Sequence, residues 1–322
     1  MVADFGAEST ADEVLHGLDL KGRRIFVTGT SAGIGVETAR ALVARGADVV
    51  GAVRDLAKAE RATIGVREAA DRSGGSFSLT ELDLASLASV RSCAERLVAD
   101  GRPFDAVIAN AAVMACPPSK TADGFEMQFG TNHLGHFVLV NRIASLIRPG
   151  GRLVMVSSAA HRNSDVDLDD PGFERTAYDP WVAYGRSKTA NVLFAVEFDR
   201  RHKGRGVRAV ALHPGGIQTE LNRYLDPAAL QAVIDRINEG AAMSGAKVFS
   251  YKSIPQGAAT SVWAALVAPA DKVGGLYCED CHVAESTTNM EVRIGIRPYA
   301  LNPDTAKALW AKSEEMVGEH FA

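Results

Sequence analysis

Short apolar runs alternate with segments of helical periodicity through the first two thirds of the chain. The runs are rich in β-branched residues and bounded by turn-forming residues, which predicts strands. The segments between them repeat their apolar residues every three or four positions, which predicts helices. This order is typical of a parallel sheet covered by helices. We predict strands at residues 24–28, 48–53, 76–82, 106–109, 152–157 and 207–212, and helices at residues 35–45, 56–72, 87–100, 124–147, 182–203 and 256–267.

Three further segments depart from this alternation. Residues 162–181 are polar and rich in turn formers, which predicts a surface loop. Residues 221–251 carry apolar side chains at helical spacing after a glycine-rich turn, which predicts either a helical lid or a helix packed permanently on the core. Residues 303–317 are amphipathic, with Trp310 and Met316 as the expected docking residues. The apolar positions of the lid segment are Leu221, Leu225, Leu230, Val233, Ile234 and Ile237.

With 322 residues, 47% of them hydrophobic and 23% charged, the chain can bury the core of one large α/β domain. The formal net charge of -4, with Lys and Arg spread along the chain, argues against a nucleic-acid partner. No apolar run is long enough to cross a bilayer and the first residues are acidic, so we expect no membrane contact and a cytoplasmic location. We expect an N-terminal arm at residues 1–20, a doubly wound domain at 21–285 and a helical tail at 286–322.

The turn after the first strand has the chemistry of a phosphate site. Glycines permit positive φ and a close approach of the backbone to a ligand. The free N–H groups and the positive end of the helix that follows attract a pyrophosphate. The turn reads Thr28-Gly29-Thr30-Ser31-Ala32-Gly33-Ile34-Gly35, and we expect Gly29, Ser31, Gly33, Ile34 and Gly35 to bind a dinucleotide.

The spacing of this turn, TGxxxGxG, resembles that of the short-chain dehydrogenase/reductase family. Over residues 20–285 further motifs occur in the family's order. The resemblance implies a single Rossmann-type domain, a doubly wound parallel sheet with helices on both faces, and a nicotinamide cofactor. The residues it assigns to the cofactor are Asp83 and Leu84 beside the adenine, Asn110 and Ala111 of an NAG-like motif whose glycine is replaced by Ala112, and the Pro214-Gly215 turn with Ile217 and Thr219 beside the nicotinamide.

The end of the second strand, Ala52-Val53-Arg54-Asp55, bears on the choice between the two nicotinamide cofactors. At this place NAD enzymes carry an acid that bonds the ribose 2′-hydroxyl, whereas an arginine accommodates the 2′-phosphate of NADP. Arg54 takes the first exposed position and its planar guanidinium suits a phosphate, while Asp55 would cap the next helix. We expect NADP(H) to be preferred. In the alternative, Arg54 points to solvent, Asp55 binds the ribose and NAD(H) is used.

Tyr184 and Lys188 stand four residues apart near the start of a predicted helix, so their side chains lie on one face. A phenol with a pKa of about 10 transfers protons poorly at neutral pH, and a nearby ammonium together with an oxidised nicotinamide lowers that pKa. The family resemblance completes a catalytic tetrad with Asn132, which would hold a water, and Ser158, which would bond the substrate oxygen. Ser157 is the structural alternative to Ser158. The tetrad predicts an NADP(H)-dependent oxidoreductase that interconverts a carbonyl and an alcohol on a mainly apolar small molecule, with Tyr184 as general acid/base.

Two other functions stay open: an NADP(H)-binding regulatory protein without turnover, and an NAD-dependent alcohol dehydrogenase. The long insertion before Tyr184 and the strings VRD, VSSAAH and HPGGIQTEL resemble the retinol-dehydrogenase-like branch of the family, here without a membrane anchor. Many relatives are homodimers, and we expect the same unless the C-terminal tail covers the surface. The side chains expected at that interface are Phe137, Val140, Leu193 and Phe194.

A second motif, Cys278-Glu279-Asp280-Cys281-His282, matches the pattern for covalent haem attachment. It follows a segment that reads as a final strand of the same sheet, and its three potential ligands are fewer than a structural zinc requires. We therefore expect reduced, packed cysteines and no metal site.

Overall fold

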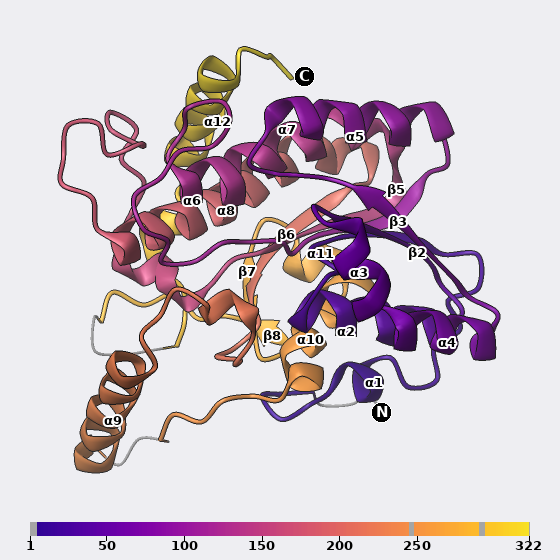
Figure 1. Ribbon diagram of the computed structural model, residues 1–322, viewed down its shortest axis with the longest axis horizontal. Coiled ribbons are helices and arrows are strands. Elements are labelled where there is room, and N and C mark those ends of the chain that lie inside the picture. Colours follow the sequence, from indigo (N-terminus) through magenta and orange to yellow (C-terminus); the bar gives the residue numbers. More distant parts are fainter. Residues whose placement is uncertain (1–4, 245–247, 290–293, 322) are drawn as a thin grey trace.

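One mixed sheet forms the centre of the molecule (Figure 1). The computed structural model describes residues 5–244, 248–289 and 294–321. In these residues the strand order is β3-β2-β1-β4-β5-β6-β7-β8, with parallel pairs throughout except for the antiparallel pair of β7 and β8. This is the doubly wound arrangement that the sequence predicts. The strands are β1 Arg24–Thr28, β2 Asp48–Val53, β3 Ser76–Glu81, β4 Phe104–Ala109, β5 Ile147–Val156, β6 Arg208–His213, β7 Tyr277–Glu279 and β8 His282–Val283.

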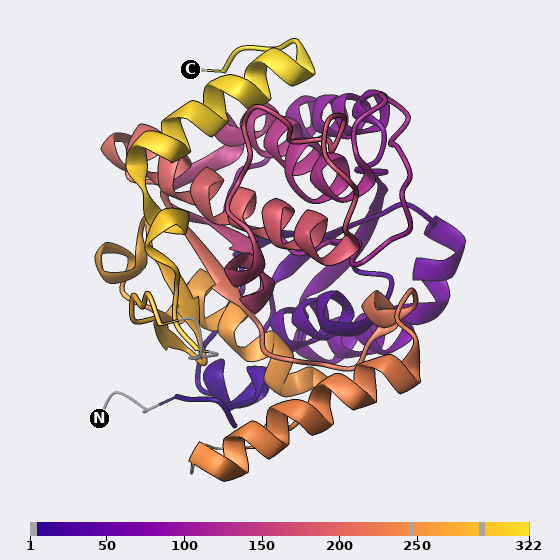
Figure 2. The ribbon, with the colours of Figure 1, turned by 90° about the vertical axis from the view of Figure 1, so that its left-hand side faces the viewer.

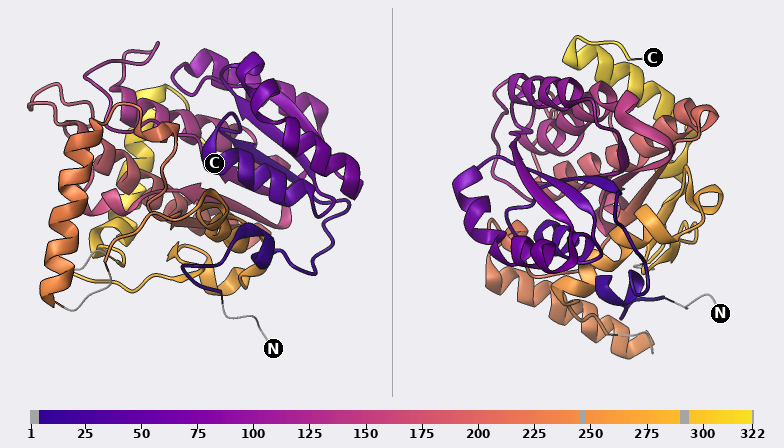
Figure 3. Two further views of the ribbon diagram at one scale, coloured as in Figure 1. Left: turned by 60° about the horizontal axis from the view of Figure 1, so that its bottom comes forward. Right: turned by 90° about the vertical axis from the view of Figure 1, so that its right-hand side faces the viewer.

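Helices cover both faces of the sheet and enclose one apolar core on each side (Figures 2 and 3). On one face α5, α7, α8 and α12 pack together, and on the other α1, α2, α4 and α10 do so. The helices are α1 Ala11–Val14, α2 Gly33–Val43, α3 Leu56–Ala62, α4 Ile64–Ser73, α5 Leu87–Asp100, α6 Met127–Phe129, α7 Gly135–Arg142, α8 Pro180–His202, α9 Pro227–Ser244, α10 Ile254–Val262, α11 Ala270–Val273 and α12 Pro303–Val317.

The predicted helix at residues 124–147 differs most from the structure. The Glu126 carboxylate accepts two backbone N–H bonds and so fixes the helix start at α6. A π-helical turn, Gly130–Leu134, then separates α6 from α7. The helix ends with α7, because Ile147 pairs with Phe104 and therefore belongs to β5. Both β4 and β5 consequently begin earlier than predicted.

Two other elements were wrong or missed in the prediction. The helix expected at residues 56–72 is broken at Thr63, whose hydroxyl donates to the Ala59 carbonyl at 2.7 Å and ends α3. The final strand expected just before Cys278 is present as β7, but β8 and the hairpin were missed, because the turn consists of Asp280 and Cys281, both with positive φ, rather than glycine. The loop expected between β5 and α8 is confirmed.

The predicted lid contains α9, which stands at the edge of the molecule apart from the two helical layers (Figures 1 and 3). The side chain of Asn238 in α9 accepts the N–H of Phe249 at 2.7 Å, and Ile234 is buried. Residues 245–247 and the side chains of Val233 and Ile237 lie outside the described part of the chain. The segment returns to the body where the Lys252 N–H donates to the Gly216 carbonyl at 2.9 Å.

The C-terminal helix α12 lies on α7 and α8, as the amphipathic pattern predicts (Figure 2). Trp310 is 2% exposed and contacts the rings of Phe137 and Phe194. The Arg201 guanidinium lies 4.1 Å from the centre of the Trp310 ring. The four side chains expected at a homodimer interface are therefore buried within a single chain. That burial excludes these four side chains from an interface, whereas a homodimer through another surface stays a prediction. The four are Phe137, Val140, Leu193 and Phe194.

Candidate active site

The glycine-rich turn connects β1 to α2 at the carboxyl edge of the sheet, where open α/β folds bind their ligands. Gly29 and Gly33 have positive φ, and α2 starts without a side-chain cap or an acidic residue in its first turn. Its first N–H groups can therefore donate to an anion. Ser31, Gly33 and Thr219 line a recess at this place. The turn thus fits the pyrophosphate of a dinucleotide.

Close packing against the end of β4 explains two of the glycines. A Cβ atom on Gly35 would lie 2.2 Å from the Gly29 carbonyl oxygen, and one on Gly29 would lie 2.9 Å from the Cα of Ala111. The Asn110 side-chain amide donates to the Thr28 carbonyl at 2.9 Å. Asn110 and Ala111 therefore hold the turn in place from the neighbouring strand. Any larger residue at either glycine would push the turn away from β4.

Arg54 and Asp55 occupy the positions that the sequence predicts at the end of β2. Arg54 is exposed and has no hydrogen-bond or ion-pair partner in the described residues. The Asp55 carboxylate accepts the Lys58 N–H at 2.9 Å and caps α3. The arginine is therefore available for an anionic ligand, whereas the aspartate already has a structural task.

The remaining residues assigned to the cofactor lie in the loops after β3 and β6, except Ile34, which belongs to α2. Asp83 accepts the Ala85 N–H at 3.0 Å in a tight turn after β3, and Leu84 is buried in the core. Beyond β6, Gly215 has a φ of 105°, and Ile217 pairs with Lys252 in a parallel bridge. Thr219 caps a short 3₁₀ turn, and Ile34 packs on the core with its side chain.

Tyr184 and Lys188 face each other in the first turns of α8. The Lys188 amino group is 5.6 Å from the centre of the Tyr184 ring and donates to the Val156 carbonyl at 2.9 Å. Burial lowers the pKa of Lys188 to about 7. Burial also raises the pKa of Tyr184 to about 12, although its hydrogen bond with Ser158 acts in the opposite direction. The lowered tyrosine pKa that the sequence predicts is therefore not a property of the protein groups alone.

The adjacent serines after β5 have separate partners. The buried Ser157 hydroxyl donates to the Lys188 carbonyl at 2.7 Å and so fastens α8 to the sheet. The Ser158 hydroxyl accepts the Ala160 N–H at 3.1 Å and also hydrogen-bonds the Tyr184 phenol. Of the two candidates, Ser158 is the one beside the tyrosine oxygen.

Asn132 lies in the π-helical turn and is fully buried. Its side-chain amide exchanges two hydrogen bonds of 2.9 Å with the backbone of Val113 and donates to Ser187 at 3.0 Å. π-Helical turns occur frequently at functional sites, because the extra residue turns a carbonyl out of the helix ladder. Because the Asn132 side chain already bonds Val113 and Ser187, a water would have to bind the backbone carbonyl of Asn132 instead.

Sequence reasoning missed an apolar cluster that includes Tyr184. Met114 and Ala115 are buried against the tyrosine, and Leu221 and Leu225 from the start of the lid segment pack on them. The lid leucines were predicted as apolar helix positions, but nothing in the sequence paired them with residues 114 and 115. The four side chains form an apolar wall beside Tyr184.

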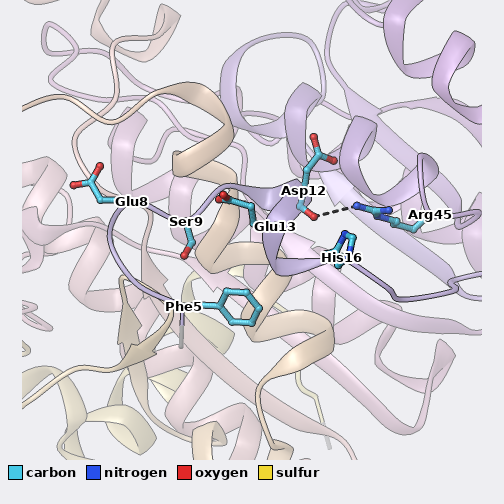
Figure 4. A pocket seen from close by; sticks show the side chains of 7 residues that line it. All are labelled: Phe5, Glu8, Ser9, Asp12, Glu13, His16 and Arg45. Atoms are coloured by element: carbon cyan, nitrogen blue, oxygen red, sulfur yellow. Dashed lines mark hydrogen bonds between the residues drawn. The ribbon is translucent and has the colours of Figure 1, made fainter. Parts of the chain in front are cut away.

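Two other candidate sites lack such chemistry. Cys278 and Cys281 are buried free thiols in the core, whereas His282 is exposed, and no group of metal-binding side chains occurs in the described residues. A recess at the N-terminal arm is lined by carboxylates (Figure 4). There Asp12 pairs with Arg40, and Glu13 closes the capping box of α1. Those carboxylates are already occupied by structural partners.

Comparison with known proteins agrees with this geometry. Residues 23–229 match the family model for the short chain dehydrogenase. Short-chain dehydrogenase/reductase prx1 of Penicillium roqueforti is 37% identical over 97% of this chain and 91% of its own length. Retinol dehydrogenase 14 of Mus musculus is 35% identical over 93% of this chain and 87% of its own.

Solved structures have the same fold. The crystal structure of an uncharacterized protein from Mycobacterium paratuberculosis has a TM-score of 0.70 and 32% identity, covering 98% of this chain and 99% of that one. A short chain dehydrogenase from Burkholderia cenocepacia, crystallised with NADP, has a TM-score of 0.63 and 23% identity, covering 82% and 98%.

Fold, site and relatives together define an NAD(P)-dependent oxidoreductase. The chain belongs to the short-chain dehydrogenase/reductase family and is similar to its retinol-dehydrogenase-like members. Within the described residues, no helix is long and apolar enough to span a bilayer.

Proposed function

We propose that the protein uses NADP(H) to interconvert a ketone or aldehyde and the corresponding alcohol on a mainly apolar small molecule. One observation carries the proposal: Tyr184 belongs both to the pair with Lys188 and to the apolar wall formed with Met114 and Leu221. A carbonyl placed against the phenol would have its apolar remainder on that wall. The exposed Arg54 at the end of β2 supports NADP(H) over NAD(H).

In this mechanism Tyr184 and Ser158 act on the substrate oxygen. In the reducing direction the Tyr184 phenol donates its proton to the substrate oxygen, and in the oxidising direction the phenolate takes it back. The Ser158 hydroxyl donates a hydrogen bond to the same oxygen and orients it. When bound, the nicotinamide ring supplies or accepts the hydride at the carbonyl carbon.

Lys188 and Asn132 complete the proton path. An ammonium at Lys188 would favour the phenolate form of Tyr184, which offsets the effect of burial on the tyrosine. Its amino group is also available to the nicotinamide ribose. The backbone carbonyl of Asn132 would hold the water through which the proton reaches solvent.

The test is an assay with a panel of ketones, aldehydes and quinones of increasing apolar size, in the presence of NADPH or of NADH. Oxidation of the cofactor is measured as loss of its absorbance. We expect turnover with NADPH that improves with apolar size. Binding of NADPH without turnover on any substrate, in the wild type and in Tyr184→Phe alike, would instead support a regulatory nucleotide sensor. Equal use of NADH would support an NAD-dependent alcohol dehydrogenase.

A further inference from the structure

His136 is a buried histidine with a partner on each ring nitrogen. It lies in α7 and is fully buried. Its Nδ1 is 3.0 Å from the Asn132 carbonyl oxygen, and its Nε2 is 3.0 Å from the Thr28 hydroxyl. A carbonyl can only accept, so Nδ1 carries the hydrogen. Burial lowers the pKa of His136 to about 4, so the ring is neutral at physiological pH, and Nε2 must accept a hydrogen bond from Thr28.

This assignment uses every hydrogen-bonding capacity of the Thr28 hydroxyl. The hydroxyl donates to His136 and accepts the N–H groups of Asn110 and Ala111, both at 2.9 Å. The threonine thereby joins the ends of β1 and β4, one residue before the close contact between Gly29 and Ala111. The imidazole fixes the direction of the hydroxyl on which this junction depends.

Nδ1, the other ring nitrogen of His136, connects the histidine to the residues around Tyr184. It binds the carbonyl of Asn132, the group through which the proposed proton path runs. The Asn132 amide donates to the Ser187 hydroxyl at 3.0 Å, and that hydroxyl donates to the Tyr184 carbonyl at 2.8 Å. A continuous series of hydrogen bonds therefore leads from the nucleotide turn, through His136, to the helix that carries the catalytic tyrosine.

We propose that His136 is a positioning residue with two separable hydrogen bonds. One bond positions the nucleotide turn, and the other positions the Asn132 carbonyl beside the catalytic residues. The Nε2 bond to Thr28 sets the nucleotide turn and hence cofactor affinity. The Nδ1 bond to Asn132 sets the direction of the carbonyl in the proton path and hence turnover. The second half rests on the proposed function, whereas the first can be tested by cofactor binding alone.

Two substitutions separate the bonds. His136→Asn places an amide nitrogen near the position of Nδ1, so it keeps the bond to Asn132 and loses the one to Thr28. His136→Gln reaches the position of Nε2, so its carbonyl oxygen keeps the bond from Thr28 and the one to Asn132 is lost. The measurements are the NADPH dissociation constant by tryptophan fluorescence, the pH profile of kcat, and the melting temperature.

We expect His136→Asn to weaken NADPH binding roughly 3- to 10-fold, the loss of one buried hydrogen bond, with the pH profile of kcat unchanged. We expect His136→Gln to keep the dissociation constant within about 2-fold of wild type, to lower kcat roughly 10-fold and to shift its pH profile. The matched control is His133→Asn. That histidine is also buried in the preceding turn, but it bonds Ser313 of the tail at 2.8 Å, so its substitution should lower the melting temperature alone.

The results that would contradict the proposal for His136 differ from those that would contradict the proposed function. If both His136 variants change affinity and kcat together, or behave like His133→Asn, the histidine has only a structural role and the proposal is wrong. His136→Asn could weaken NADPH binding as expected while neither the wild type nor any variant turns over a carbonyl. In that case the role of the Thr28 bond in cofactor affinity is supported and the proposed function is wrong.

Discussion

The Lys188 amino group lies 5.6 Å from the Tyr184 ring centre, and its hydrogen bond goes to the Val156 carbonyl at the end of β5. Both groups are buried, and burial moves each toward its neutral form: the pKa of Lys188 falls to about 7 and that of Tyr184 rises to about 12. A positive charge added in the site would lower the pKa values of both groups.

Tyr184→Phe should remove the proton donor and leave the packing intact. Because a lost general acid/base group typically costs 10² to 10⁴-fold, we expect turnover to fall by about that factor. The NADPH dissociation constant should stay close to that of the wild type, since the phenyl ring still fills the apolar wall. Turnover near the wild-type value on a confirmed substrate would remove Tyr184 from the mechanism.

Lys188→Met should stabilise the cofactor-free protein at low pH while abolishing turnover. The folded-state pKa of Lys188, about 7, lies below its ordinary value of 10.5, so the unfolded chain binds more protons between these values. Wild-type stability from this group therefore rises with pH across that window and is lowest below pH 7. We expect the variant to exceed wild type by roughly 2 to 4 kcal/mol at pH 6 and by less at pH 9.

Denaturant unfolding at the two pH values checks this, with Lys307→Met on the exposed side of α12 as the control. A stability difference that is the same at both pH values would mean that the Lys188 ammonium is not penalised by burial.

Arg54→Ala should change the choice of cofactor. A charged contact contributes roughly 1.5 to 3 kcal/mol, so kcat/KM for NADPH should fall by about 10- to 100-fold, with little change for NADH. Lys58→Ala, in the helix capped by Asp55, is a matched control for loss of a nearby positive charge. Equal losses with both cofactors would show that Arg54 does not read the 2′-phosphate.

The lid segment, residues 221–251, should become protected when a substrate analogue binds with NADPH. Leu221 and Leu225 already pack at Tyr184, so a ligand on the apolar wall would hold them there. Hydrogen exchange followed by mass spectrometry would report slower exchange in peptides from α9. Protection of the sheet without any change in these peptides would identify a permanently packed helix instead of a lid.

Trp310→Ala should uncover the face of α7 and α8 that the tail occupies. Truncation of a buried tryptophan costs about 3 to 5 kcal/mol, so unfolding should begin at markedly lower denaturant. The wild type should have the mass of a monomer in light scattering, and the variant should associate through the exposed phenylalanines. Lys307→Ala on the same helix should change neither property. A wild-type dimer that persists in Trp310→Ala would place the interface elsewhere.

The features that the sequence predicts well depend on short-range patterns. Strands β1, β2, β4, β5 and β6 contain apolar runs and β3 alternates polar with apolar residues, and the Tyr184 and Lys188 pair needs only the pitch of one helix. The exposure of Arg54 and the cap formed by Asp55 are also predicted correctly, and the cap needs only the Lys58 N–H three residues further on.

The features that it does not predict depend on contacts between distant residues. His136 and Thr28 are 108 positions apart, and no local pattern distinguishes this histidine from His133. At the π-helical turn, the Asn132 side chain bonds the backbone of Val113, 19 positions earlier in the chain, and no helix pattern shows this contact. The helix faces at Phe137 and Phe194 look like an interface in the sequence because Trp310, which covers them, comes more than a hundred residues later.

We expect the tail to dock late in folding. Arg91 in α5 donates to Glu319, beyond α12, across 228 positions of the chain, so this contact must wait for nearly the whole domain to form. Until α12 docks, an intermediate with a complete sheet carries an uncovered aromatic surface that can capture a second chain. Refolding yield should therefore fall with protein concentration during that interval, and a peptide of residues 303–321 added in excess should restore it.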